Sequence, residues 1–146
     1  MTQTYAAEPD RCLLVEASMR AAIAFEHTKL GLAHALSRPM GIATGESHDR
    51  FNLLLGPPVV SFWGDEVLAA SALAEDVALD PVANLWIELL DHLRAEAGLP
   101  ARLSETGLTE EDREAALAWA PNSSGIPHLP RPLADGDLRR LVEEAW

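Results

Sequence analysis

Two histidines, His34 and His48, have the residue type and the setting to support chemistry. They lie fourteen residues apart, with an Arg-Pro break and a Gly-rich connection between them. Imidazole is a good ligand for Zn²⁺ and Fe²⁺, so the pair can supply half of a metal site. The alternative is that each is an ordinary core or helix-capping histidine. A spacing of this size is no local motif, and the pattern alone leaves both interpretations open.

His27 lies seven residues before His34, which is two helical turns if Gly31 does not break the helix. It can act as a further ligand or be a surface histidine. Cys12 stands beside a Leu-Leu-Val run and is expected to be a small buried side chain rather than a nucleophile. We find no phosphate-binding Gly-rich loop and no nucleophile elbow in the sequence.

Length and composition limit the class of protein. A chain of 146 residues with 48% hydrophobic residues suits one domain with a real core. The net charge of -12 argues against nucleic acid and against an anionic membrane surface as partners. A single cysteine excludes an intramolecular disulfide and favours the cytoplasm. The N-terminal sequence does not resemble a signal peptide, and no apolar run approaches the ~20 residues of a membrane span.

The sequence predicts an all-α fold, with residues 1–9 as an extended arm and 10–146 as one helical domain. A helix is expected from Arg11 to about Thr28. A second apolar segment runs to Ser37, and its helix should end or kink near Arg38, because Pro39 has no amide donor. A loop, GIATGES, should follow it. The next helix should begin near Ser47 and kink at Gly56-Pro57-Pro58.

The second half of the chain carries clearer helix signals. Gly64-Asp65 is expected to break the chain before a short helix over residues 66–75. Asp80-Pro81 is typical of a helix start, and that helix should end at Gly98. Thr109 and Asp112 predict a capping box for a helix to about Trp119. Residues 121–132 are expected to form a Pro-rich loop, followed from about residue 135 by a last helix.

The stretch GLAHALSRPMGIATGESHDRFNLLLGPPV resembles a segment of iron-containing alcohol dehydrogenases. That segment reads roughly G-x-x-H-A-M-A-H-x-L-G, then a loop, then P-H-G-x-x-N-A-x-L-L-P-x-V. The maleylacetate reductase branch has a similar stretch. AGLPARLSETGLTEEDREAALAWA and LPRPLADGDLRRLVEEAW resemble the helix pair and the ending of the same helical domain. The resemblance covers residues 13–146 and implies an all-α bundle.

The resemblance implies that His34 and His48 bind the catalytic metal, Fe²⁺ or Zn²⁺. We further expect Arg38 and His27 to contact substrate and Phe25 to contact the nicotinamide cofactor. The family's second histidine of the first motif is Arg38 here, and the glycine after the second ligand is Asp49. A guanidinium at Arg38 would repel a metal dication and favour a carboxylate.

The family's nucleotide-binding domain and two further metal ligands have no counterpart in this sequence. The sequence therefore predicts the helical subunit of a split, NAD(P)H-dependent oxidoreductase. A separate nucleotide-binding α/β subunit would complete the metal site in a heteromer that acts on a small molecule. The alternatives are a non-catalytic scaffold or regulatory module, and a repurposed pocket that uses Arg38 and His48 without metal.

Overall fold

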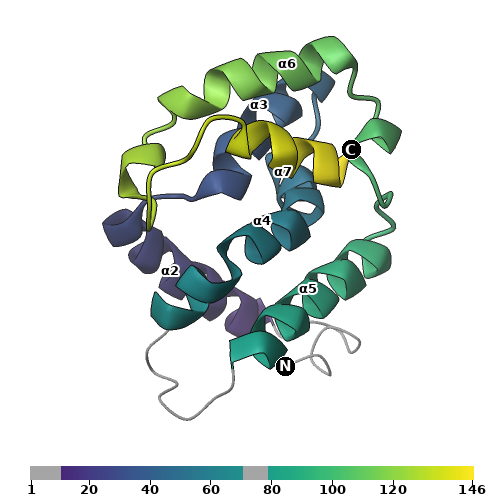
Figure 1. Ribbon diagram of the computed structural model, residues 1–146. Coiled ribbons are helices and arrows are strands. Elements are labelled where there is room, and N and C mark those ends of the chain that lie inside the picture. The colour runs from purple at the N-terminus through teal and green to yellow at the C-terminus, as the bar shows by residue number, and fades with distance from the viewer. Residues whose placement is uncertain (1–10, 71–78) are drawn as a thin grey trace. The chain divides into compact units, whose positions relative to one another are not determined.

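The computed structural model describes residues 11–70 and 79–146 (Figure 1). All regular elements in these two ranges are α-helices and short 3₁₀ turns, and neither range contains a strand. This confirms the predicted all-α class. No helix in the described part of the chain is long and apolar enough to cross a membrane. The expected arm over residues 1–9 lies outside the described residues.

The chain divides into two compact units, Met1–Leu30 and Gly31–Trp146, which we describe separately. In the first unit, α2 spans Arg11–Thr28, as the sequence predicted. None of its residues is buried, and Cys12 is exposed, so the expectation of a buried thiol was wrong. Lys29, at φ 62°, ends the helix in the left-handed region. The assignment of residues 10–146 to one domain stays a prediction.

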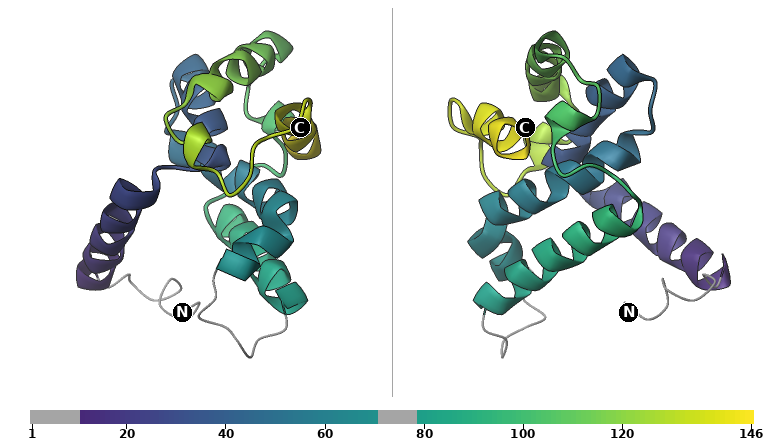
Figure 2. Two further views of the ribbon diagram at one scale, coloured as in Figure 1. Left: turned by 60° about the vertical axis from the view of Figure 1, so that its left-hand side comes forward. Right: turned by 90° about the vertical axis from the view of Figure 1, so that its right-hand side faces the viewer.

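Over residues 31–70 and 79–146, the second unit is a bundle of five α-helices. They are α3 (Leu32–Thr44), α4 (His48–Ala70), α5 (Leu79–Glu96), α6 (Glu110–Trp119) and α7 (Asp137–Ala145). The 3₁₀ turns are η1 (Leu103–Glu105), η2 (Ala120–Asn122) and η3 (Ile126–His128). Helix α4 packs against α3, α5 and α7, and α6 lies on α3 (Figures 1 and 2). Helices α3 and α4 are therefore central to the bundle.

The sequence predicted that the helix would either end or kink near Arg38, and α3 does not end there. It continues through Pro39 to Thr44, so the connection to α4 shrinks to residues 45–47. Pro39 removes one backbone hydrogen bond. Three apolar side chains of the same helix, those of Ala35, Leu36 and Met40, are almost completely buried. Burial of this face stabilises the helix by more than one missing hydrogen bond costs.

The predicted break at Gly64-Asp65 was also wrong, because α4 runs without interruption from His48 to Ala70. It passes through Gly56-Pro57-Pro58, and Trp63 is 4% exposed in a cluster with Leu32 and Leu141. Packing of Trp63 holds this part of the helix in place, whatever the local preference of Gly64. The remainder of the short helix predicted for 66–75 lies beyond residue 70, outside the described residues.

The capping box of α6 is confirmed. The Asp112 N–H donates to the Thr109 hydroxyl at 3.1 Å, and the Thr109 N–H donates to Asp112 Oδ2 at 3.0 Å. Helix α5 begins one residue before the predicted Asp80, and the predicted loop over 121–132 holds only 3₁₀ turns. The main core joins α3, α4, α6 and α7. Its members are Ala35, Leu36, Met40, Phe51, Leu54, Leu55, Leu103, Leu108, Ala116, Ala120, Val142 and Ala145.

Asp137, at the start of α7, connects that helix to the preceding loop. Its side chain is 2% exposed, accepts a hydrogen bond from the Ala134 N–H at 2.8 Å and pairs with Arg140. Arg131 Nη1 lies 3.6 Å from Asp137 Oδ2, and the Arg131 guanidinium is 4.7 Å from the centre of the Phe62 ring. The Ala134 hydrogen bond, with help from the two arginines, holds the pKa of Asp137 below its usual range.

We expect Asp137→Asn to lower the free energy of unfolding at pH 7. Because the folded-state pKa of Asp137 lies below the unfolded-state value, its stabilisation is complete above about pH 4. It is lost as the pH falls through the folded-state pKa. Urea unfolding at pH 7 and pH 3 measures this, and the gap between wild type and variant should narrow at pH 3. A gap that is the same at both pH values would contradict the assignment.

Candidate functional site

The structure brings His34 and His48 together. Their ring centres are 4.9 Å apart and the ring planes are nearly perpendicular, at 89°. His34 lies in the first turn of α3, and His48 is the first residue of α4. The side chain of His48 is 41% exposed, and His34 is partly buried. The two imidazoles therefore share one site that is open to solvent on one side.

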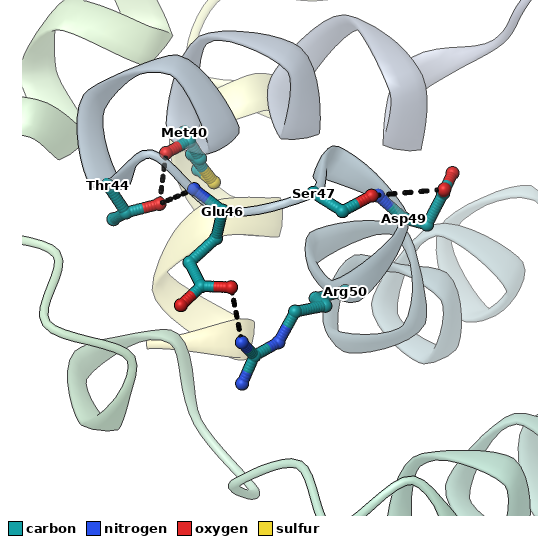
Figure 3. A network of polar contacts seen from close by, with 6 residues as sticks. All are labelled: Met40, Thr44, Glu46, Ser47, Asp49 and Arg50. Carbon is teal, nitrogen blue, oxygen red and sulfur yellow. Dashed lines mark hydrogen bonds and ion pairs between the residues drawn. The ribbon is translucent and has the colours of Figure 1, made fainter.

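The connection between α3 and α4 is short because it is closed by local hydrogen bonds (Figure 3). Gly45 takes a left-handed φ of 72° as the C-cap of α3. The Thr44 hydroxyl donates to the Met40 carbonyl at 3.0 Å and accepts from the Glu46 N–H at 3.4 Å. Glu46 then pairs with Arg50, one turn into α4. These contacts turn the chain directly from the end of α3 into α4.

Ser47 caps α4 and fixes where His48 stands. Its hydroxyl accepts from the Asp49 N–H at 3.4 Å and donates to Asp49 Oδ2 at 3.1 Å (Figure 3). A serine hydroxyl that accepts from the second amide of a helix is a common N-cap. The cap makes His48 the first helical residue, so its position depends on the backbone of the connection.

Gly41 allows α3 to approach this connection closely. A Cβ atom built on Gly41 would lie 2.9 Å from the Glu46 carbonyl oxygen and 3.1 Å from the Cα and N atoms of His48. These neighbours are backbone atoms and cannot rotate away as a side chain can. Any other residue at position 41 would displace the start of α4, and with it His48.

A second contact between the helices was not found from the sequence. The Ser37 hydroxyl donates to Asn52 Oδ1 at 2.7 Å, and Ser37 is completely buried. Ser37 follows His34 by three residues and Asn52 follows His48 by four. Spacings of three and four place both partners on the helix faces that carry the histidines. That shared spacing is the signal that could have pointed to the pair.

The surroundings of His34 favour its neutral form. Burial lowers the pKa of His34 most, positive charge on His48 and Arg38 lowers it further, and Asp49 opposes them. A neutral imidazole has a free lone pair, which a metal ligand needs. The electrostatics of the site therefore keep His34 available for a metal ion at neutral pH.

His48 has a carboxylate beside it. Nε2 of His48 lies 3.4 Å from Asp49 Oδ1, and the Asp49 side chain is 78% exposed. When Nε2 carries the proton, it donates to Asp49 and leaves the Nδ1 lone pair for a metal, the usual arrangement of a ligand histidine and a supporting carboxylate. When Nε2 is the ligand, Asp49 has to turn away, and its exposure allows this.

The ring separation fits two ligands on one metal ion. An imidazole bound at ~2.1 Å has its ring centre roughly 3.2 Å from the ion, so two rings at ligand angles of about 90–110° have centres about 4.5–5.2 Å apart. The observed 4.9 Å falls in this interval. Among the residues that the structure describes, no three His, Cys, Asp or Glu side chains come together as a metal site. Residues 11–70 and 79–146 thus bring two imidazoles together without a third such side chain beside them.

Arg38 lies one turn after His34 on α3 and is exposed. Its guanidinium carbon is 5.8 Å from the centre of the Trp119 ring at the end of α6. An arginine that rests on an aromatic ring keeps its hydrogen-bond donors free for a planar anion. A cationic group therefore stands beside the two imidazoles.

Phe25 and His27, the predicted cofactor and substrate contacts, belong to the first unit. Both are exposed on α2, and the Phe25 side chain is 40% exposed. Their predicted roles stay predictions.

Comparison with known proteins places the chain in a family. Residues 3–146 match the model of the Fe-containing alcohol dehydrogenase family, C-terminal. The chain belongs to this family, and the resemblance inferred from its motifs is confirmed. It is related to alcohol and aldehyde oxidoreductases, and members of the family typically use iron and NAD(P).

Two relatives illustrate the similarity. Lactaldehyde reductase of Escherichia coli (strain K12) is 25% identical over 134 residues, which is 86% of this chain and 35% of the relative. 4-Hydroxybutyrate dehydrogenase of Cupriavidus necator is 27% identical over 145 residues, 92% of this chain and 37% of the relative. The chain thus spans little more than a third of the length of these relatives. No solved structure matches it significantly.

We expect Gly41→Ala to destabilise the protein although alanine favours helices. The gain in helix propensity is about 1 kcal/mol, and forcing a methyl group against fixed backbone costs about 1–3 kcal/mol. The start of α4 should move and carry His48 away from His34. Urea unfolding and the nuclear Overhauser effects between the two imidazoles measure the two consequences.

Gly64→Ala is the matched control, because Gly64 is also helical and a Cβ there meets nothing within 4 Å. This variant should be stabilised by roughly 0.5–1 kcal/mol and should keep the imidazole contact. Equal behaviour of the two variants would show that Gly41 has no positional role.

Proposed function

We propose that this chain is the helical, metal-contributing subunit of a split oxidoreductase of the iron-containing alcohol dehydrogenase type. A separate nucleotide-binding α/β subunit would bring NAD(P)H and the remaining metal ligands. The observation that carries the proposal is the pair of imidazoles at 4.9 Å, on the two residues for which the sequence resemblance implies a role as metal ligands.

His34 and His48 would hold Fe²⁺ or Zn²⁺ through one nitrogen each. The bound metal would act as a Lewis acid on a carbonyl oxygen. The chain contributes three things to this: two imidazoles at a fixed separation, a neutral His34, and a face open for the partner. The solvent-accessible side of the pair supports the proposal, because the remaining ligands need room to approach.

The substrate would be a small carbonyl compound that carries a carboxylate. Arg38 supports this choice, because its guanidinium lies one turn from His34 and rests on Trp119. A guanidinium matches a carboxylate with two parallel hydrogen bonds. One of the two relatives is named for a substrate with a carboxylate, 4-hydroxybutyrate, and the other for lactaldehyde, which has none.

A non-catalytic scaffold or regulatory module is the second candidate. The observation in its favour is Asp49, where the family motif has glycine. An Asp49 carboxylate that holds the Nε2 proton of His48 would compete with a metal at that nitrogen. In that case the imidazole pair would remain as part of the bundle without a metal.

Metal content separates the two candidates. We expect a tagged chain, isolated with its nucleotide-binding partner from native cells, to contain Fe or Zn by elemental analysis. His34→Ala and His48→Ala should each remove the metal, because a buried or half-buried site cannot replace a lost imidazole. His92→Ala, at an exposed position on α5, should leave the metal content unchanged.

Two results together would contradict the proposal of a split oxidoreductase. A chain that co-purifies with no nucleotide-binding protein and whose cellular role survives the His34→Ala, His48→Ala double substitution would be the non-catalytic module.

Arg38→Leu tests the substrate class in the same complex. Loss of a charged hydrogen-bond partner costs about 1.5–3 kcal/mol, which is roughly a tenfold to hundredfold loss of kcat/KM. We expect this loss for 4-oxobutanoate and a much smaller change for butanal, which has the same chain length and no carboxylate. If both compounds lose reactivity equally, Arg38 does not recognise the carboxylate.

A further inference from the structure

We infer that the buried Ser37–Asn52 hydrogen bond sets the register of α3 on α4 and thereby holds the two imidazoles at ligand distance. The inference rests on the proposed function, because it assigns a positioning role toward the proposed metal. Neither residue is a catalytic residue.

The geometry couples this bond to the histidines. Ser37 is one turn from His34 on α3, and Asn52 is one turn from His48 on α4. The Ser37 Oγ to Asn52 Oδ1 distance is 2.7 Å, so the hydrogen bond would break if α3 moved along α4 by more than a fraction of a turn. A shift of α3 along α4 by one turn is about 5.4 Å, which would break the bond and separate the rings.

The chemistry of the interface makes this bond selective. The neighbouring contacts of α3 and α4 are made by apolar side chains such as Leu36, Met40 and Leu55. Apolar contacts are non-directional and remain favourable at several registers. A hydroxyl with no exposure to solvent loses its only strong partner in any other register and cannot turn to water instead. The polar pair therefore discriminates among registers that the apolar contacts tolerate.

Other contacts made by the two residues do not replace this one. The Ser37 hydroxyl also lies 3.4 Å from the His34 carbonyl oxygen, but one hydroxyl proton serves one acceptor well, and the Asn52 contact is far shorter. Gly41 brings the same two helices together at the next turn by steric fit. Gly41 sets how closely they approach, and Ser37–Asn52 sets how far along each other they lie.

The test compares single and double substitutions in the full chain. Asn52→Leu leaves the buried Ser37 hydroxyl without its partner, and Ser37→Ala leaves the partly buried Asn52 amide without its partner. Each single substitution should lower the urea midpoint. The double substitution Ser37→Ala, Asn52→Leu replaces both partners by apolar groups of similar shape, which is often nearly neutral for stability. We expect it to recover the midpoint and still lose the imidazole contact.

Two measurements report on the relative position of the His34 and His48 imidazoles. The first needs no metal: nuclear Overhauser effects between the ring protons of His34 and His48 should be present in wild type and absent in the double variant. The second is Zn²⁺ binding by titration calorimetry, where we expect about a tenfold weaker affinity, at the lower end of the effect of residues that support metal ligands.

Ser104→Ala is the matched control. It also removes one serine hydroxyl bond between distant segments, 2.6 Å from Ser104 Oγ to the Trp146 carbonyl oxygen. It should lower the midpoint and leave the ring contact and Zn²⁺ affinity unchanged. This separates a positioning role from a general loss of stability.

The experiments distinguish failure of the register inference from failure of the proposed metal role. If the double variant keeps the ring contact, the register inference is overturned, whatever the metal does. If His34→Ala and His48→Ala leave the Zn²⁺ affinity at its wild-type value, the proposed metal role fails. The contact between the two rings still tests the register inference in that case.

Discussion

The close approach of α3 to the start of α4 is the constraint on which the rest of the structure depends. Gly41 has no side chain and faces the backbone of Glu46 and His48, so the connection can turn after only residues 45–47. A longer connection would leave His48 free to move relative to His34. The short one converts fourteen residues of sequence separation into 4.9 Å between ring centres. The same approach also exposes one side of the pair, because the helices cross instead of enclosing it.

Electrostatics at the α3–α4 contact favour the neutral form of His34. Burial and the positive charges of Arg38 and His48 lower the pKa of His34, and only Asp49 opposes them. The whole chain carries a net charge of -12, so the positive charge of Arg38 near His34 is a local exception to the overall field. Asp49 is exposed, so it stays hydrated and its ion pair with His48 is weak, whereas Arg38 rests on Trp119. The arrangement is suited to an anion that approaches Arg38 beside a neutral His34.

Local signals predicted most of the fold, and tertiary packing explains the failures. Thr109 and Asp112 were sufficient to place α6, because a capping box is a property of four neighbouring residues. Pro39 and Gly64 do not end their helices, because burial of Met40 and Trp63 outweighs their local preferences. The motif pointed to His34 and His48 as a pair, but it did not predict the 4.9 Å contact between their rings. Ser37 and Asn52 were missed because a bond across fifteen residues exists only at one crossing of two helices.

Under the proposed function, the incomplete donor set links metal binding to assembly. Two imidazoles alone hold a divalent ion weakly, because structural and catalytic sites use three or four protein ligands. An ion that binds the assembled site far better than either half must stabilise the assembly by the same factor, since linkage is reciprocal. The relative orientation of the two imidazole rings then matters more than the metal affinity of the pair alone. A partner can add ligands, but it cannot correct two rings that face the wrong way, so the helix crossing has to be fixed before the halves meet.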